Sequence, residues 1–140
     1  MGVKRATVSD LGEILRIGKR FYDGSVWAGV VKYDPAHFSN WALDMITGSG
    51  VIFLSEDGFC GGMLAPVYFS SETKIASELF WHCEDSHGAA LHAAFEAWAK
   101  DSGANIVEMT GQINAREKGI RRLYRSRGYD AREIGFFKVL

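Results

Sequence analysis

The spacing of apolar residues over the first 24 positions predicts a short strand followed by a helix. Val3–Val8 is predicted to be the strand. The helix begins at Asp10, which lies three residues before Glu13, the spacing of a capping box. Apolar and small residues three and four positions apart form its buried face: Leu11, Ile14, Leu15, Gly18, Phe21 and Tyr22.

A loop around Trp27–Tyr33 separates this helix from a second one. The second helix begins at Asp34-Pro35, where a capping residue precedes a proline at the first helical position. Gly48 ends it. Its predicted buried face consists of Phe38, Trp41, Ala42, Met45 and Ile46.

The middle of the chain changes to the pattern of strands joined by turns. Val51–Leu54, Phe59–Phe69 and Ile75–His82 are the predicted strands. Polar turns separate them at 56–58 and at 70–73. Because the connections are short, the three strands are expected to form an antiparallel meander.

The remaining chain alternates helices and strands. A helix is predicted from Gly88 to about Lys100, a strand over Asn105–Thr110, a helix over Arg116–Arg127 and a last strand over Ile134–Val139. The unit from residue 75 to 110 is therefore strand–helix–strand, which closes as a right-handed crossover between parallel strands. The prediction is one α/β domain over residues 1–140, with a mixed sheet.

Composition and charge narrow the class of protein. The length of 140 residues fits one domain, and 47% apolar with 24% charged residues is typical of a globular chain. The net charge of −1 argues against attraction to nucleic acid or anionic membranes. No apolar run approaches the roughly 18 residues of a membrane span. Cys60 and Cys83 are the only cysteines, so no disulfide framework is expected. The expected location is therefore the reducing cytoplasm.

The start of the crossover helix is the predicted ligand site. Ligands bind at the carboxyl ends of parallel strands, and a helix N-terminus with free amides suits a phosphate. Small residues at 86 and 88–90 would let an anion approach the backbone. Glu84 and Asp85 stand beside this position, and their charges would repel a pyrophosphate.

Two local motifs are present in the second half of the chain: Gly88-x-x-Leu91, continuing into 95–99, and the segment Leu123–Tyr129. With the order of elements, they resemble the GCN5-related N-acetyltransferase (GNAT) family over nearly the whole chain, and the second motif is similar to the family's Leu-Tyr-x-x-x-Gly-Phe/Tyr. The family has short members in bacteria and in bacterial phages, and the segment Glu78–Trp81 resembles the phage members. The resemblance implies acetyl-coenzyme A as donor and direct transfer to a primary amine. No metal is expected, because the sequence contains no established metal-ligand spacing.

The pyrophosphate loop of the family, Gln/Arg-x-x-Gly-x-Gly/Ala, has two alignments here. One alignment puts Cys83 at the Gln/Arg position and Gly88 last; the other begins at Asp85. Neither supplies the Gln or Arg, so the loop is atypical. By resemblance the cofactor contacts are Cys83, Ser86, His87, Gly88, Ala89 and Ala90.

Three residues are candidates for catalysis. By resemblance Tyr124 is the general acid that protonates the departing thiolate, although it also fits the buried stripe of the last helix. Glu78 is the preferred general base and His82 the second, because residues four apart in a strand share a face. A salt bridge for Glu78 and a carbonyl partner for His82 are the alternatives without a catalytic role.

The last helix is basic. Arg121, Arg122 and Arg125 lie within about one turn of one another and are predicted to replace the missing cation of the loop. A solvated face is the alternative. The cluster of His, Cys and acidic residues at 82–87 lacks an established metal-ligand spacing.

The predicted function is acetyl transfer to a small-molecule or protein amine. The alternative is a GNAT-like module without catalysis that serves a structural or interaction role, such as a component of a phage particle, which would place it in the virion. Nucleic acid and membranes are not expected partners, and self-association stays open.

Overall fold

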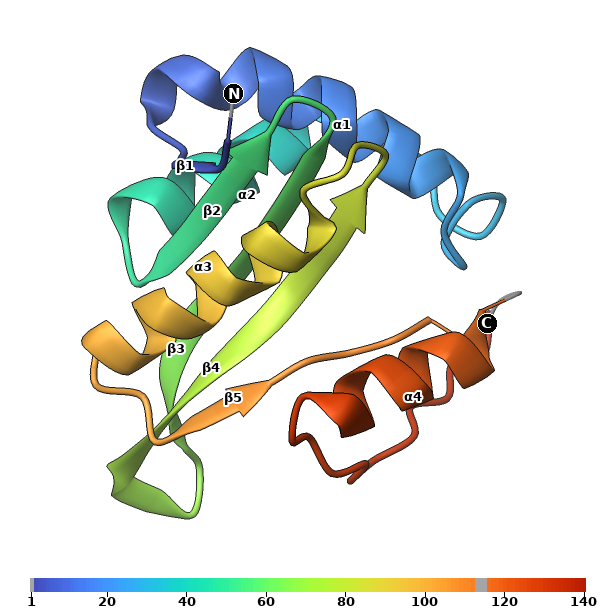
Figure 1. Cartoon of the computed structure of the whole chain (residues 1–140). Helices are drawn as coiled ribbons and strands as arrows, with labels where there is room; N and C mark the ends of the chain where they lie inside the picture. The colour runs from blue at the N-terminus through green and yellow to red at the C-terminus, as the bar shows by residue number, and fades with distance from the viewer. Residues whose placement is uncertain (1, 113–115) are drawn as a thin grey trace.

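A five-stranded mixed sheet with helices on both faces forms the frame of the protein (Figure 1). The computed structural model describes residues 2–112 and 116–140. The strands, which lie side by side in sequence order, are β1 (Lys4–Arg5), β2 (Gly50–Ser55), β3 (Gly58–Val67), β4 (Ser70–Cys83) and β5 (Ile106–Glu108). The helices are α1 (Leu11–Asp23), α2 (Pro35–Thr47), α3 (Gly88–Asp101), α4 (Glu117–Ser126) and the 3₁₀ turn η1 (Val8–Asp10).

The N-terminal strand is shorter than predicted because its chain turns early. Only Lys4 and Arg5 pair with β2. The Thr7 amide donates to the Asp10 carboxylate over 2.8 Å and closes a capping box at η1. The box predicted between Asp10 and Glu13 is therefore wrong, since Asp10 turns back to Thr7. The cap at Asp34 is confirmed: its carboxylate accepts the His37 amide at 3.1 Å.

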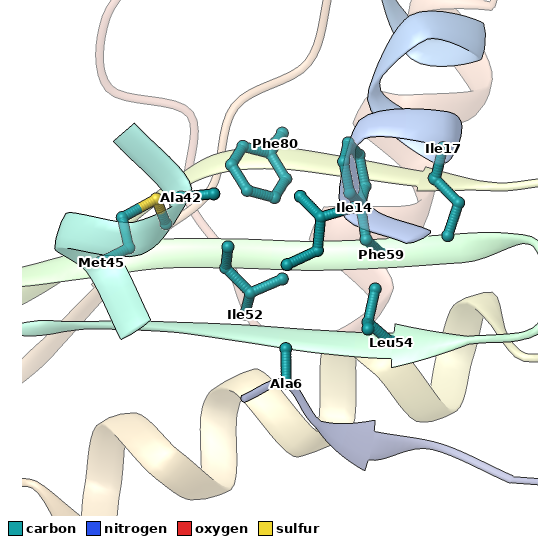
Figure 2. Close-up of a cluster of buried hydrophobic side chains, with 9 residues drawn as sticks. All are labelled: Ala6, Ile14, Ile17, Ala42, Met45, Ile52, Leu54, Phe59 and Phe80. Atoms are coloured by element: carbon teal, nitrogen blue, oxygen red, sulfur yellow. The ribbon is translucent and has the colours of Figure 1, made fainter. Parts of the chain in front are cut away.

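The sheet buries two separate apolar cores because alternate residues of a strand point to opposite faces. Ile52 and Phe59 face α1 and α2, whereas Val51 and Cys60 face α3. Figure 1 shows α3 on one face of the sheet and α1 with α2 on the other. Figure 2 shows the first core, in which strand residues meet Ile14, Ile17, Ala42 and Met45.

The predicted fold class is confirmed by the strand directions. β2 to β4 pair antiparallel as a meander, and β4 pairs parallel with β5 through α3. The parallel register ends at Ser77 and Glu108, although β4 continues to Cys83. The two chains then diverge (Figure 1).

A β-bulge interrupts β4 directly after this point. Gly61 pairs with Phe80 and Gly62 with Glu78, so Leu79 is an extra residue without a partner in the register. Two glycines face the bulge because β-carbons do not fit there. A β-carbon on Gly62 would lie 2.3 Å from the Ser77 carbonyl oxygen, and one on Gly61 2.7 Å from the Phe80 ring.

Two predictions about the later elements are wrong. The hairpin between β3 and β4 turns at Tyr68-Phe69, both exposed, whereas the predicted turn at 70–73 belongs to β4. The predicted strand Ile134–Val139 is absent; the segment from 129 to 140 has no regular structure. Its apolar residues pair with no strand, and Phe137 instead stacks on Trp27 with ring centroids 5.3 Å apart. No helix in the two described ranges is long and apolar enough to cross a membrane.

We expect Gly62→Ala to destabilise the protein by about 1–3 kcal/mol, the usual cost of overpacking a tight site. The added methyl would meet a backbone oxygen and the Phe95 ring, neither of which can move freely. Gly12→Ala in α1, where no atom lies within 4 Å, is the matched control and should leave the unfolding midpoint unchanged or slightly higher. Chemical denaturation of both variants measures the difference. Equal midpoints for Gly62→Ala and the parent would contradict the account of the bulge.

Candidate active site

Glu78 is a buried carboxyl group at the point where β4 and β5 part. Only 5% of the surface of Glu78 is exposed to solvent. Thr110, in the chain that leaves β5, donates its amide over 3.4 Å and its hydroxyl over 3.2 Å to the two carboxyl oxygens. Burial raises the pKa of Glu78 to about 7, with the Thr110 bonds opposing the shift and Glu108 adding to it. The alternative of a salt bridge for Glu78 is wrong, because its hydrogen-bond partner is the neutral Thr110.

Tyr124 reaches the same place from α4. Its hydroxyl donates to the Thr110 carbonyl oxygen over 2.8 Å. Its ring lies 6.0 Å from Trp81, 6.3 Å from His92 and 5.5 Å from Tyr129, measured between centroids. Burial, and then the charge of Glu78, raise the pKa of the Tyr124 hydroxyl well above its usual range, so it stays protonated. Thr110 therefore joins the two predicted catalytic residues.

His82 does not share the face of Glu78, contrary to prediction. The extra residue at Leu79 reverses the alternation, so that His82 turns toward α1. Its ring lies 5.6 Å from Phe21, and its Nε2 is 3.2 Å from a Glu84 carboxylate oxygen. The carbonyl partner predicted for His82 is thus replaced by a carboxylate.

Glu84 and Asp85, the acidic residues of the loop before α3, have hydrogen-bond and ion-pair partners in other parts of the protein. Glu84 forms a two-pronged ion pair with Arg20 of α1, with distances of 2.5 and 2.7 Å. This pair, with His82, lowers the pKa of Glu84 to about 2. Glu84 is thereby neutralised by a cation from α1 rather than left facing an anion.

Asp85 is turned toward the β2–β3 turn. Its carboxylate accepts the Ser55 hydroxyl and the Asp57 amide, each over 2.7 Å, and also the His87 amide over 2.7 Å. Burial alone would raise the pKa of Asp85, but these bonds and one from Cys83 hold it well below its usual range. The expected repulsion of an anion by this side chain is reduced, because the carboxylate is already saturated with donors.

The start of α3 presents small residues and backbone amides. Ser86, Ala89 and Ala90 are exposed. The amides in the first turn of a helix lack intrahelical acceptors. The Trp81 indole donates to the Gly88 carbonyl over 3.2 Å and joins the end of β4 to the start of α3. The predicted cofactor positions at 83–90 thus form one partly exposed turn next to the end of β4.

The basic residues of α4 lie on its outer side. Arg121, Arg122 and Arg125 line a shallow hollow of about 530 Å³ together with Lys118 and Ser126. Arg121 also pairs with Glu117 at 3.2 Å. No hydrogen bond or ion pair within the described parts of the chain joins these arginines to residues 83–90. The cation that does reach α3 is Arg127, which hydrogen-bonds to His92 and lies 6.0 Å from the Trp81 ring.

Four residues beside Tyr124 were not predicted: Thr110, His92, Arg127 and Tyr129. His92 had a local signal, since it lies next to the apolar stripe of α3 and four residues before Glu96. Arg127 and Tyr129 lie within the motif at 123–129, but their contacts with His92, like those of Thr110 with Glu78, join distant segments. Among the side chains that the structure describes, no three His, Cys, Asp or Glu residues are grouped as metal ligands would be.

Comparison with known proteins identifies the fold through structure alone. No family model matches the chain, and no curated protein matches it significantly by sequence. A probable acetyltransferase is 15% identical, with a TM-score of 0.73 over 100% of this chain and 97% of that one. An aminoglycoside acetyltransferase from an uncultured soil metagenomic sample, in complex with sisomicin, is 15% identical, with a TM-score of 0.69 over 99% and 95% of the chains.

A further similar solved structure is of a protein with acetyl-CoA. It is a predicted acetyltransferase with acetyl-CoA from Clostridium acetobutylicum, 10% identical, with a TM-score of 0.70 over 98% of this chain and 94% of that one. These likenesses extend over nearly the full length of both chains compared. They confirm the fold that the motifs at 88–99 and 123–129 indicated, so the chain has the fold of the GNAT acetyltransferases.

Proposed function

We propose that the protein transfers an acetyl group from acetyl-coenzyme A to a primary amine. The observation that carries this proposal is the triad of Glu78, Thr110 and Tyr124 at the point where β4 and β5 part. A carboxyl group with a pKa of about 7 and a protonated phenol are the base and the acid that such a transfer needs. The fold shared with acetyltransferases supports the same conclusion, although a fold alone does not establish activity.

The donor would bind along the parted strands. Its pyrophosphate would lie against the first turn of α3, where Ser86, His87, Gly88, Ala89 and Ala90 present their backbone and Cys83 precedes them. Its pantetheine arm would extend between β4 and the chain leaving β5, with the thioester near Tyr124. Within the described parts of the chain, Arg121, Arg122 and Arg125 form no hydrogen bond or ion pair with this turn, so they would supply the charge that the loop lacks by reaching the bound phosphates from α4.

The transfer would proceed in one displacement. Glu78 accepts a proton from the ammonium group, directly or through water, and the free amine attacks the thioester carbonyl. A carbon–nitrogen bond forms, the carbon–sulfur bond breaks, and Tyr124 gives its proton to the leaving thiolate. The nitrogen gives up its second proton to water, and Tyr124 regains a proton from solvent, which leaves a neutral amide and free coenzyme A. His82, the second candidate base, lies on the other face of β4 beyond the bulge, and we therefore assign the role to Glu78.

Direct transfer is favoured over an acyl-enzyme. Cys83 is the cysteine nearest to the predicted donor site, and its thiol donates to the Asp85 carboxylate over 2.9 Å. Burial, together with this hydrogen bond, raises the pKa of the Cys83 thiol. A protonated thiol beside a carboxylate is a poor nucleophile.

The acceptor would approach from the loop between α1 and α2. The Val26 amide donates to the Gln112 side-chain oxygen over 3.1 Å, which holds this loop against the chain that follows β5. Trp27 is exposed in the same loop. A structural neighbour was solved with an aminoglycoside, so a small-molecule amine is the acceptor class that we propose first, with a protein amine as the other.

Acetyl-coenzyme A should bind the protein in calorimetric titration. A charge-assisted contact contributes about 1.5–3 kcal/mol, so Ala at Arg121, Arg122 or Arg125 should weaken binding about ten- to a hundredfold in at least one variant. That variant should also show a shallower salt dependence. If the parent binds and all three variants match it, the arginines are only a solvated face. No binding by the parent would favour the module without catalysis.

Tyr124→Phe should lower kcat by about 10²–10⁴-fold, the usual contribution of a positioned proton donor, and leave the affinity for acetyl-coenzyme A nearly unchanged. The substitution removes the hydroxyl that binds Thr110 and keeps the ring contacts. Steady-state kinetics and titration of the same preparation separate the two quantities. Unchanged turnover would leave Tyr124 with a packing role alone.

The rate should rise with pH through about 7, because Glu78 must lose its proton to act as a base. Its pKa is raised, so the group is protonated and inactive below that value. Glu78→Gln should abolish this limb of the kcat/KM profile and lower its plateau by about 10²-fold or more. Glu72→Gln, at an exposed site in β4, is the control and should retain the parent profile. A profile without a limb near pH 7 in the parent would remove Glu78 from the mechanism.

A further inference from the structure

His92 is a buried histidine that the proposed chemistry does not use. It lies in the second turn of α3 and is 1% exposed. Its Nε2 is 2.9 Å from the Tyr129 hydroxyl, and its Nδ1 is hydrogen-bonded to the Arg127 guanidinium. The side chain therefore contacts both residues that follow the last turn of α4 around Gly128.

The hydrogen bonds among Arg127, His92, Tyr129 and Glu96 all donate in the same direction, from Arg127 toward Glu96. The Tyr129 hydroxyl gives its single proton to the Glu96 carboxylate, 2.9 Å away, so it must accept from Nε2–H of His92. Nδ1 is then unprotonated and accepts from Arg127. The result is a chain from Arg127 through His92 and Tyr129 to Glu96. It has a cation at one end, a carboxylate at the other and a neutral imidazole within it.

Two members of this hydrogen-bonded chain, Arg127 and Tyr129, are also bonded to the backbone of Tyr124. The amides of Arg127 and Tyr129 both donate to the Tyr124 carbonyl oxygen, each over 3.0 Å. Gly128, with φ of 87°, makes the tight turn that allows both bonds. Since no side chain of α4 is fully buried, the helix has few other anchors that could set the position of Tyr124.

We propose that His92 is a positioning residue, whose neutral imidazole holds the end of α4 on α3 and thereby orients Tyr124 for proton transfer. The inference rests on the general-acid role proposed for Tyr124. The charged or titratable groups that face His92 are Glu96 from its own helix, Arg127 and Tyr129 after α4, and Tyr124 within α4.

Protonation of His92 breaks the chain at one bond. An imidazolium carries hydrogen on both ring nitrogens, so Nδ1 can no longer accept from Arg127 and two cations then face each other. Burial lowers the pKa of His92; the Glu96 carboxylate opposes this shift and the Arg127 charge adds to it. The linkage is thus intact at neutral pH and is lost as the pH falls through the lowered pKa.

Histidine side-chain NMR of the full chain tests the linkage without any cofactor. His92, assigned with His92→Gln among the four histidines, should carry its proton on Nε2 and titrate below the ordinary histidine pKa of about 6.5. The Tyr124 ring resonances should shift with the same midpoint. A proton on Nδ1, or Tyr124 resonances that ignore the titration, would overturn the proposal. This result stands even if the protein proves to be no acetyltransferase.

A double-mutant cycle separates positioning from plain stability. Tyr129→Phe keeps the ring but breaks the chain, and should lower kcat about tenfold, as a slight misplacement of a catalytic group does, with KM for acetyl-coenzyme A within about twofold of the parent. In the Tyr124→Phe background the same change should have no further effect. Tyr68→Phe, an exposed hairpin tyrosine, should leave kcat unchanged.

Equal losses from Tyr129→Phe in both backgrounds would mean that Tyr129 acts on stability rather than through Tyr124, and the proposal would be wrong. Thermal unfolding of each variant shows which preparations are folded at the assay temperature. If Tyr129→Phe does not fold, His92→Gln takes its place in the cycle, since Gln keeps a donor near the Nε2 position but lacks the Nδ1 acceptor. The prediction for it is the same.

Discussion

Parallel pairing between β4 and β5 stops after three residue pairs, and the buried polar groups beyond that point must find other partners. Glu78 is the first side chain past the last pair on β4, and Thr110 lies in the chain that has left β5. The Thr110 amide and hydroxyl donate to the Glu78 carboxyl group, and the Thr110 carbonyl oxygen accepts the Tyr124 hydroxyl. The bond from Tyr124 to Thr110 is one of the few contacts that hold α4, because α4 buries none of its own side chains completely.

The helices and the meander were predictable because they depend on spacing within a few residues. The α2 cap at Asp34 and the start of α3 at Gly88 are confirmed for that reason. Local spacing could not decide between two overlapping capping boxes, and Asp10 turned to Thr7 rather than serving Glu13. A strand also needs a partner, so the apolar run at 134–139 could not be assigned from its own residues.

The active-site prediction failed where it assumed an unbroken strand. Glu78 and His82 are four residues apart, yet one inserted residue at Leu79 places them on opposite faces. The adjacent glycines Gly61 and Gly62 in the facing strand were the available signal. Tyr124 could be found through its motif. His92 could not be connected to Arg127 and Tyr129, which lie 35 and 37 residues away in the sequence.

The loop before α3 holds its shape through its own carboxylate. Asp85 ties Ser55, Asp57 and His87 together, so the β2–β3 turn and the start of α3 are fixed to each other. A binding loop that is already ordered loses little conformational entropy when a ligand arrives. The same carboxylate occupies the His87 amide, leaving the amides of Gly88, Ala89 and Ala90 for an anion. The loop thus has one free amide fewer, because the His87 amide is bound to Asp85, but its remaining amides are held in fixed orientations. Its affinity for a phosphate group depends on these remaining amides.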